Sequence, residues 1–363
     1  MSGGETSPTL AERLLAGDEL ALARAISVVE DEAPGFEALL HAVDKRVGGA
    51  RRIGITGPPG AGKSTLTAGL ARAYLDRGLR VGVIAVDPTS TFTGGALLGD
   101  RIRMTELATV PGVFIRSMAS RGSVGGLAAS TREAADLMDA FGMECILLET
   151  VGVGQSELEV VASADTTVVV LVPESGNGIQ ALKAGLMEVA DLFVVNKADR
   201  PGAERLENEI RVMLTIRRGA AWRGIPPHSG EADHHHRSPR RAVPLAKGSG
   251  PEAEGAGAAP TEWRPPVLRT VASTADGLEA LVAALERHLA FLEQSGELGR
   301  RRERARLERA RGALLRRLAQ VGSRVWEARR GELESRLASG QLSPYEAADE
   351  MWSLLGVGDS AEA

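Results

Sequence analysis

The chain has 363 residues, of which 43% are hydrophobic, 25% charged and 3% aromatic, and its formal net charge is -5. This composition is typical of a soluble globular protein, and the length suffices for one large α/β core with extensions. The mild acidity argues against a protein that coats nucleic acid, because that task needs a concentrated basic field. The single cysteine, Cys145, excludes an intramolecular disulfide and suits a reducing compartment.

No apolar run approaches the roughly 20 residues that a membrane span needs. The first residues also lack the basic and apolar pattern of a secretory signal. We therefore expect a cytoplasmic protein without a membrane partner, with Cys145 buried in an apolar strand.

Residues 8–47 show helical periodicity. Apolar residues recur there at the spacing of one helix face, which predicts short helices packed on the core. The residues that mark these faces are Leu10, Leu14, Leu15, Leu20, Ala23, Ile26, Leu39, Leu40 and Val43. We expect an N-terminal helical extension over residues 1–50.

From residue 51, short β-branched runs alternate with helical patterns. The runs are RRIGIT, RVGVIAVD, GVFIRS, ECILLET, TTVVVLVPE, LFVVNKAD and PVLRTVA. Near-continuous apolar strands separated by helices are typical of a parallel sheet covered on both faces. The sequence therefore predicts a doubly wound, mostly parallel α/β domain over residues 51–295. Between residues 217 and 262, a stretch rich in Gly, Pro, Ala and charge predicts a surface insertion without regular structure.

Residues 296–363 are expected to form a helical arm. Its apolar positions mark one helix face, and the opposite face is almost wholly charged. The apolar positions are Leu307, Leu314, Leu318, Val321 and Val325. Such an arm cannot bury its stripe alone, so we expect it to pack on the core or on a second copy of the chain. Glutamates among its arginines favour a solvated face over nucleic-acid binding.

The segment GPPGAGKST, residues 57–65, lies between a predicted strand and a predicted helix and satisfies G-x-x-x-x-G-K-[ST]. Backbone N–H groups of such a loop wrap phosphates, and the helix N-terminus adds a favourable dipole. Lys63 is expected to reach the β- and γ-phosphates, and Ser64 to bind Mg²⁺. The residues expected to contact the nucleotide are Gly57, Pro58, Pro59, Gly60, Ala61, Gly62, Lys63, Ser64 and Thr65.

The segment NKAD, residues 196–199, follows a predicted strand. In N-K-x-D motifs the Asp, here Asp199, accepts hydrogen bonds from two neighbouring donors of guanine that adenine does not offer, while Asn196 and Lys197 brace the base and the loop. Four residues alone are a weak signal. Because they follow the phosphate loop at residues 57–65 and the segment ETVG at residues 149–152, in the order that a G-domain requires, the sequence predicts binding of GTP and GDP.

Three acids are candidates for the surroundings of Mg²⁺. Asp87 and Glu149 end predicted strands, and Asp100 follows a Gly-rich segment. Because strand carboxyl ends converge on the ligand crevice of a doubly wound sheet, these acids can meet a Mg²⁺ bound by Ser64. Asp87 could instead open an Asp-Pro turn, Asp100 could cap a helix, and Glu149 could merely end a strand.

Several longer blocks resemble, in order and spacing, the MeaB/ArgK family of P-loop GTPases. The blocks are GPPGAGKST, VDPTSTFTGGALLGDRIRM, FIRSMASRGSVGGLA, ETVGVGQSE, PESGNGIQALKAGLMEVAD and NKAD. Members of this family are G-protein chaperones of adenosylcobalamin-dependent acyl-CoA mutases, chiefly methylmalonyl-CoA mutase. The resemblance runs from about residue 53 to 216 and resumes at WRPPVLRTVASTADGLEAL.

The resemblance implies further roles. Asp87, Asp100 and Glu149 resemble the family's acids around Mg²⁺, Lys63, Glu149 and Gln155 its catalytic residues, and Ala272 and Ser273 the loop that closes over the base. Residues 150–159 resemble switch II and residues 172–183 an additional switch III. The implied switch and partner residues are Gly152, Gly154, Gln155, Glu174, Asn177, Gln180 and Lys183. The family also implies a homodimer formed largely through the arm.

Two other functions remain open from the sequence. A small-molecule kinase, an activity once attached to this family by name for arginine or ornithine transport, would need an acceptor pocket and usually an Arg-bearing lid. A nickel-insertion GTPase would rely on Cys and His ligands near the switch, whereas Cys145 stands alone and the run His234, His235 and His236 lies in the insertion. No residue plainly supplies an arginine finger, so we expect slow intrinsic turnover that a partner accelerates.

Overall fold

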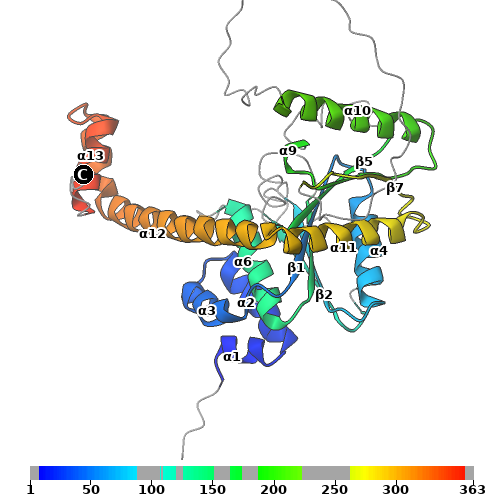
Figure 1. The fold of residues 1–363 in the computed structure, drawn as a ribbon. Coiled ribbons are helices and arrows are strands. Elements are labelled where there is room, and N and C mark those ends of the chain that lie inside the picture. The colour runs from blue at the N-terminus through cyan, green and yellow to red at the C-terminus, as the bar shows by residue number, and fades with distance from the viewer. Residues whose placement is uncertain are drawn as a thin grey trace, which may run out of the picture.

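The computed structural model describes residues 8–87, 107, 109–119, 126–150, 164–173, 187–222 and 262–355. Within these ranges, seven parallel strands form one sheet in the order β3-β2-β4-β1-β5-β6-β7 (Figure 1). The strands are β1 (Arg51–Thr56), β2 (Val81–Asp87), β3 (Val113–Ala119), β4 (Cys145–Thr150), β5 (Thr166–Leu171), β6 (Leu192–Val195) and β7 (Val267–Arg269). The predicted doubly wound α/β fold is confirmed, and all of the described pairings between these strands are parallel.

Helices cover both faces of the sheet. They are α4 (Lys63–Leu75), α6 (Gly126–Phe141), α9 (Met187–Val189), α10 (Ala203–Trp222) and α11 (Leu278–Gln294). Because side chains alternate along a strand, Leu147 packs in one cluster with α4 and α11, whereas its neighbour Leu148 packs in another with α6. Cys145 is fully buried in β4, as predicted. This alternation explains why the strands are apolar on both sides.

The N-terminal extension forms three helices and a short 3₁₀ turn that pack against α6. These are α1 (Leu10–Leu15), α2 (Glu19–Glu30), α3 (Phe36–Val43) and η1 (Asp44–Arg46). The assignment of Leu20 to the packed face is wrong, because this side chain is 77% exposed. Asp18 caps α2 through its side chain, so Leu20 falls in the first turn on the solvent side, and Leu22 and Ile26 carry the buried face.

Helix α10 extends to Trp222. The expectation that regular structure stops before residue 217 is therefore wrong by six residues. The segment Arg217–Trp222 contains Arg and Ala, which favour helix, before the Pro- and Gly-rich part begins. The rest of the expected insertion, residues 223–261, lies outside the described residues.

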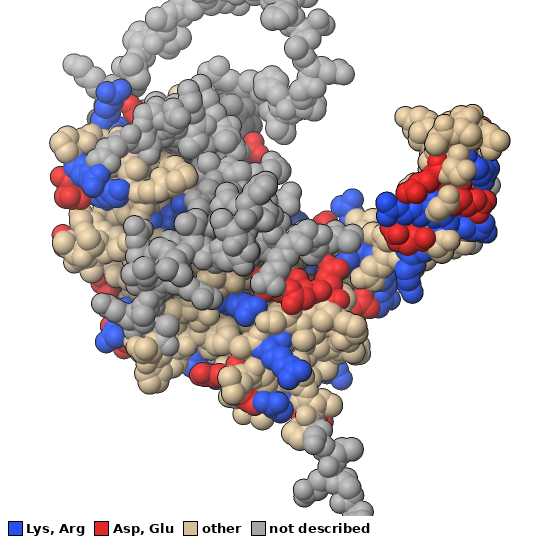
Figure 2. All heavy atoms as spheres, turned by 180° about the vertical axis from the view of Figure 1, so that it is seen from behind, with Lys and Arg blue, Asp and Glu red and all other residues tan. Residues whose placement is uncertain are grey.

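The C-terminal arm consists of α12 (Glu297–Ala338) and α13 (Pro344–Leu354), and α12 extends away from the sheet (Figure 1). Leu307 is 67% exposed, Leu314 58% and Leu318 40%. The alternative in which this stripe packs on the core is therefore wrong. Acidic and basic side chains alternate along the visible face of the arm (Figure 2). In the described part of the chain, no helix combines the length and apolar character needed to cross a membrane.

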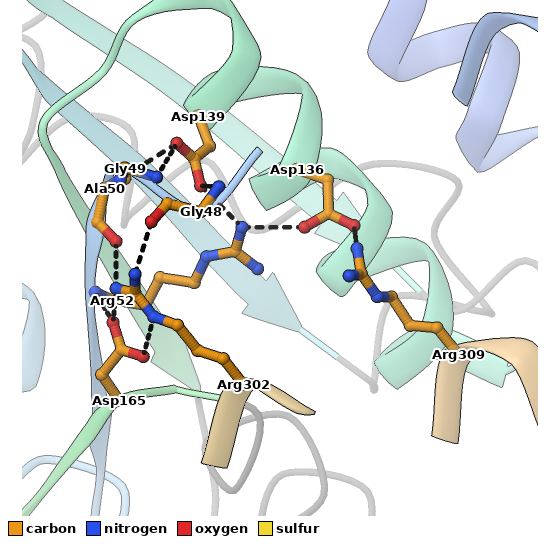
Figure 3. Close-up of polar contacts among 9 residues, drawn as sticks. All are labelled: Gly48, Gly49, Ala50, Arg52, Asp136, Asp139, Asp165, Arg302 and Arg309. Carbon is orange, nitrogen blue, oxygen red and sulfur yellow. Dashed lines mark hydrogen bonds and ion pairs between the residues drawn. The ribbon is translucent and has the colours of Figure 1, made fainter. Parts of the chain in front are cut away.

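Arginines, not leucines, attach the arm to the core. Arg302 binds the Asp165 carboxylate with both Nε and Nη2, at 3.1 and 2.9 Å, and Nη2 also donates to the Ala50 carbonyl at 2.9 Å (Figure 3). One helix heptad further on, Arg309 pairs with Asp136. The next heptad position, Arg316, lies 2.5 Å from Glu133. The charged face of α12 is therefore the face that meets the core.

Acids beside the arm's contacts also bind the start of β1. Asp139 accepts hydrogen bonds from the backbone N–H groups of residues 48–50 at 2.8 to 3.1 Å. Arg52 lies between Asp136, at 2.8 Å, and Asp139, at 3.0 Å (Figure 3). Burial alone would lower the pKa of Arg52, but these two carboxylates raise it above its ordinary value. The arm is thus fixed at the amino ends of β1 and β5.

Replacing Arg302 with Met should lower the free energy of unfolding by about 2 kcal/mol, because the buried Asp165 carboxylate loses its guanidinium partner. The measurement is urea denaturation. Arg304→Met, at an exposed position of the same helix, is the matched control and should change stability by less than about 0.5 kcal/mol. Equal losses in the two variants would contradict the anchoring role of Arg302.

Candidate nucleotide-binding site

The predicted phosphate loop lies at the carboxyl end of the central strand. Residues 57–62 connect β1 to the first turn of α4, with strands β4 and β5 on either side of β1. In a doubly wound sheet this edge is where ligands bind, and the N-terminus of α4 contributes favourable dipole for an anion.

Two glycines permit close backbone approaches in this loop. A Cβ at Gly57 would stand 2.0 Å from the Val170 carbonyl oxygen of β5, and one at Gly62 would stand 2.4 Å from the side-chain nitrogen of Asn196. Both glycines also have positive φ values, 148° and 84°, which disfavour L side chains. The glycine requirement is therefore set by neighbouring strands as well as by the loop.

Lys63 lies across the loop. Its Nζ donates to the carbonyl oxygens of Gly57 at 2.8 Å and Pro58 at 3.0 Å, and the residue is only 6% exposed. These contacts hold the ammonium group against the loop whose backbone amides are expected to bind phosphate.

Ser64 and Glu149 meet at the end of the sheet. The Ser64 hydroxyl donates to Oε1 of Glu149 at 2.5 Å, and both residues are buried. Glu149 is the next-to-last residue of β4, directly beside Ile55 of β1. A hydroxyl and a carboxylate so close together form an oxygen donor set of the type that Mg²⁺ prefers, so these two residues fit the metal that the sequence predicts.

Asn196 joins three segments that are distant in the sequence. Its Nδ2 donates to the Ala61 carbonyl at 2.8 Å. Its Oδ1 accepts from the Thr270 hydroxyl at 3.1 Å and from the Ala272 N–H at 3.0 Å. The predicted base motif is thus tied to the phosphate loop and to the loop after β7.

The other residues of the NKAD motif and of the predicted closing loop lie next to Asn196. Lys197 has a positive φ of 54°, which turns the chain after β6, and Asp199 is exposed. Ala272 is held by Asn196, and Ser273 follows it at the surface. This geometry brings the NKAD motif and the predicted closing loop together beside the phosphate loop.

Sequence reasoning missed Thr270, which is 1% exposed and binds Asn196. The available signal was a Thr at the end of the last predicted strand, beside the Ala272 and Ser273 that were predicted. Arg116 of β3 donates to Glu30 at 2.5 Å and to Ser27 at 3.0 Å on α2.

Other predicted residues are only partly covered by the structure. Asp87 ends β2, next to β4, but its side chain lies outside the described part. Further predicted site residues lie wholly outside the described ranges. These are Asp100, Gly152, Gly154, Gln155, Glu174, Asn177, Gln180 and Lys183.

Fold and site together define a P-loop GTPase. The phosphate loop follows β1, an acid lies at the end of β4, and the guanine motif follows β6 at the same edge of the sheet. The family model described as methylmalonyl-CoA mutase-associated GTPase MeaB matches residues 22–328. The chain therefore belongs to the MeaB family.

Relatives are similar over most of the chain. A putative GTPase of Pyrococcus horikoshii is 42% identical over 343 residues, covering 94% of this chain and 95% of the relative. The mouse methylmalonic aciduria type A homolog, mitochondrial, is 37% identical and covers 60% of this chain and 58% of its own length. A solved structure described as LAO/AO transport system kinase has a TM-score of 0.61 at 25% identity and covers 98% of this chain and 100% of its own.

Proposed function

We propose that this GTPase is Mg²⁺-dependent and acts as a G-protein chaperone that protects, loads or reactivates an adenosylcobalamin-dependent acyl-CoA mutase, with methylmalonyl-CoA mutase as the first candidate. The family's description, which associates its members with that mutase, supports the choice of client. The single structural observation that carries the nucleotide chemistry is the buried contact of 2.5 Å between Ser64 and Glu149 beside the phosphate loop.

Each site residue then has a stated task. Lys63 and the loop amides stabilise negative charge on the phosphates, and Asp199 selects guanine, while Asn196 holds the base loop against the phosphate loop. Ser64 and Glu149, with Asp87 and Asp100, would hold Mg²⁺. When bound, the ion would neutralise charge on the β- and γ-phosphate oxygens. Gln155 is proposed to orient the attacking water.

The segments that report nucleotide state are proposed to be switch II, residues 150–159, and switch III, residues 172–183. Both begin where a strand ends at the nucleotide edge, since β4 ends at Thr150 and β5 at Leu171. A change at the γ-phosphate would therefore act directly on the segments proposed to contact the client.

The arm is proposed to form a homodimer. Its exposed leucines lie on a helix whose other face is already bound to the core, which leaves them available to a second copy. We further propose three parts, an N-terminal helical extension at 1–50, a GTPase domain at 51–295 and a dimerisation arm at 296–363, in a cytoplasmic protein.

Affinity capture from cell extract tests the chaperone role. The tagged protein is loaded with GDP or with a non-hydrolysable GTP analogue, and retained proteins are identified by mass spectrometry. We expect an acyl-CoA mutase to be retained in a nucleotide-dependent manner. Retention of no mutase in either state would overturn the proposed client.

A small-molecule kinase is the rival function, because one structural neighbour is described as a transport system kinase. The fate of γ-labelled GTP separates the two functions. We expect the label to appear as free phosphate, whereas label on arginine or ornithine would favour the kinase.

A further inference from the structure

Two buried threonines join the strands that carry the phosphate loop and Glu149. The parallel register between β1 and β4 runs as far as the pair Ile55 and Glu149. One residue further, the Thr150 hydroxyl donates to the Thr56 hydroxyl at 3.1 Å, and it lies 3.5 Å from the Ile55 carbonyl. Both threonines are completely buried.

Each threonine is the last residue of its strand, Thr56 of β1 and Thr150 of β4. Thr56 directly precedes Gly57 of the phosphate loop, and Thr150 directly follows Glu149. Because side chains alternate, Glu149 faces Ser64 on α4, while Thr150 shares the opposite face with Leu148, which packs with α6. The hydroxyl contact therefore ties the residue after Glu149 to β1 on the sheet face opposite Ser64.

Packing alone does not require hydroxyl groups here. Valine has nearly the same shape, favours strands and would bury without a polar group. A buried hydroxyl is costly unless it is hydrogen-bonded, so two of them side by side indicate a positional role.

We propose that Thr56 and Thr150 are positioning residues for GTP hydrolysis, whose hydroxyl contact holds the Glu149 carboxylate against Ser64. The proposal rests on the proposed role of Glu149 at Mg²⁺. Without the contact, the last residue of β4 is held less firmly on the β1 side, and the carboxylate departs from Ser64 more often. Mg²⁺ affinity then decreases, whereas nucleotide affinity without metal is unchanged.

The test compares Thr150→Val, Thr56→Val and the double variant with the unmodified chain. We expect the Mg²⁺ concentration for half-maximal GTP hydrolysis to rise about tenfold in each single variant. GDP affinity in EDTA should change less than about twofold. The double variant should be no worse than either single one, because the two substitutions remove the same contact. Thr150→Ser keeps the hydroxyl and should need the same Mg²⁺ concentration as the unmodified chain.

Thr131→Val is the matched control, since Thr131 is a buried threonine of α6 whose hydroxyl donates to the Leu127 carbonyl at 2.7 Å. It should lower stability without changing the Mg²⁺ requirement. An unchanged requirement in both threonine variants, or an equal rise in Thr131→Val, overturns the positioning role.

Glu149→Gln measured in parallel separates the two proposals. If it raises the Mg²⁺ requirement while Thr150→Val does not, the positioning role is wrong and the metal role of Glu149 stands. If Glu149→Gln leaves the requirement unchanged, the metal role is wrong and the positioning role falls with it.

Discussion

Replacing Glu149 with Gln should reduce Mg²⁺-dependent GTP hydrolysis by about a hundredfold, within the range typical for loss of a residue that supports a metal. Glutamine has the same shape and keeps an oxygen that can accept a hydrogen bond from the Ser64 hydroxyl. In the unmodified chain this hydroxyl lies 2.5 Å from Oε1 of Glu149. The substitution removes the negative charge, however, from a side chain that is only 4% exposed. The variant should therefore fold normally and bind the metal weakly.

The measurement is the hydrolysis rate over a Mg²⁺ titration, with GDP affinity in EDTA as the companion value. GDP affinity without Mg²⁺ should be retained, because the phosphate loop and Lys63 are untouched. Glu144→Gln is the matched control at the exposed, opposite end of the same strand region. A Glu149→Gln variant with the normal Mg²⁺ dependence would remove this carboxylate from the proposed metal site.

Replacing Asp199 with Asn should exchange guanine specificity for xanthine specificity. The carboxylate is expected to accept two hydrogen bonds from guanine, and charge-assisted bonds of this type contribute about 1.5 to 3 kcal/mol each. An amide offers a donor where guanine also has one. GTP affinity should therefore fall by about a hundredfold or more.

Xanthine has a carbonyl oxygen where guanine has its amino group, so the amide of Asn can donate to it. Competition of GDP and XDP for a fluorescent nucleotide measures the change. We expect XDP to bind Asp199→Asn more tightly than GDP does. Glu204→Gln, at a nearby exposed acid in the first turn of α10, should leave the preference unchanged. Loss of both nucleotides without a reversal of preference would indicate damage to the loop.

The sheet was predictable because its strands β4, β5 and β6 are buried on both faces. Runs such as ECILLET and TTVVVLVPE are apolar at nearly every position, and that pattern indicates a covered parallel strand without knowledge of its neighbours. The helix boundaries were less predictable. Leu20 falls on the solvent side of α2 because the phase of a short helix depends on its cap, and α10 continues six residues into the segment where an insertion was expected.

The motif residues of the site were predictable because each motif is local. The spacing of each motif can be recognised within a few consecutive residues, and the structure brings Lys63 and Ser64 together with Glu149 and Asn196 at one edge of the sheet. Thr56, Thr150 and Thr270 were not predictable in the same way. Each acts through a contact with a strand or loop far away in the sequence, and no local spacing marks that contact.

The C-terminal arm also combines a feature that the sequence predicts with one that it does not. The sequence by itself determined that residues after 296 form a helix with one apolar and one charged face, because helical periodicity is a property of neighbouring turns. Only the tertiary structure decided which face meets the core. Arg302 and Arg309 bind Asp165 and Asp136, acids supplied by segments well over a hundred residues earlier. Those partners exist only once the order of strands has brought the starts of β1 and β5 together with α6, and that order is not written in any local pattern.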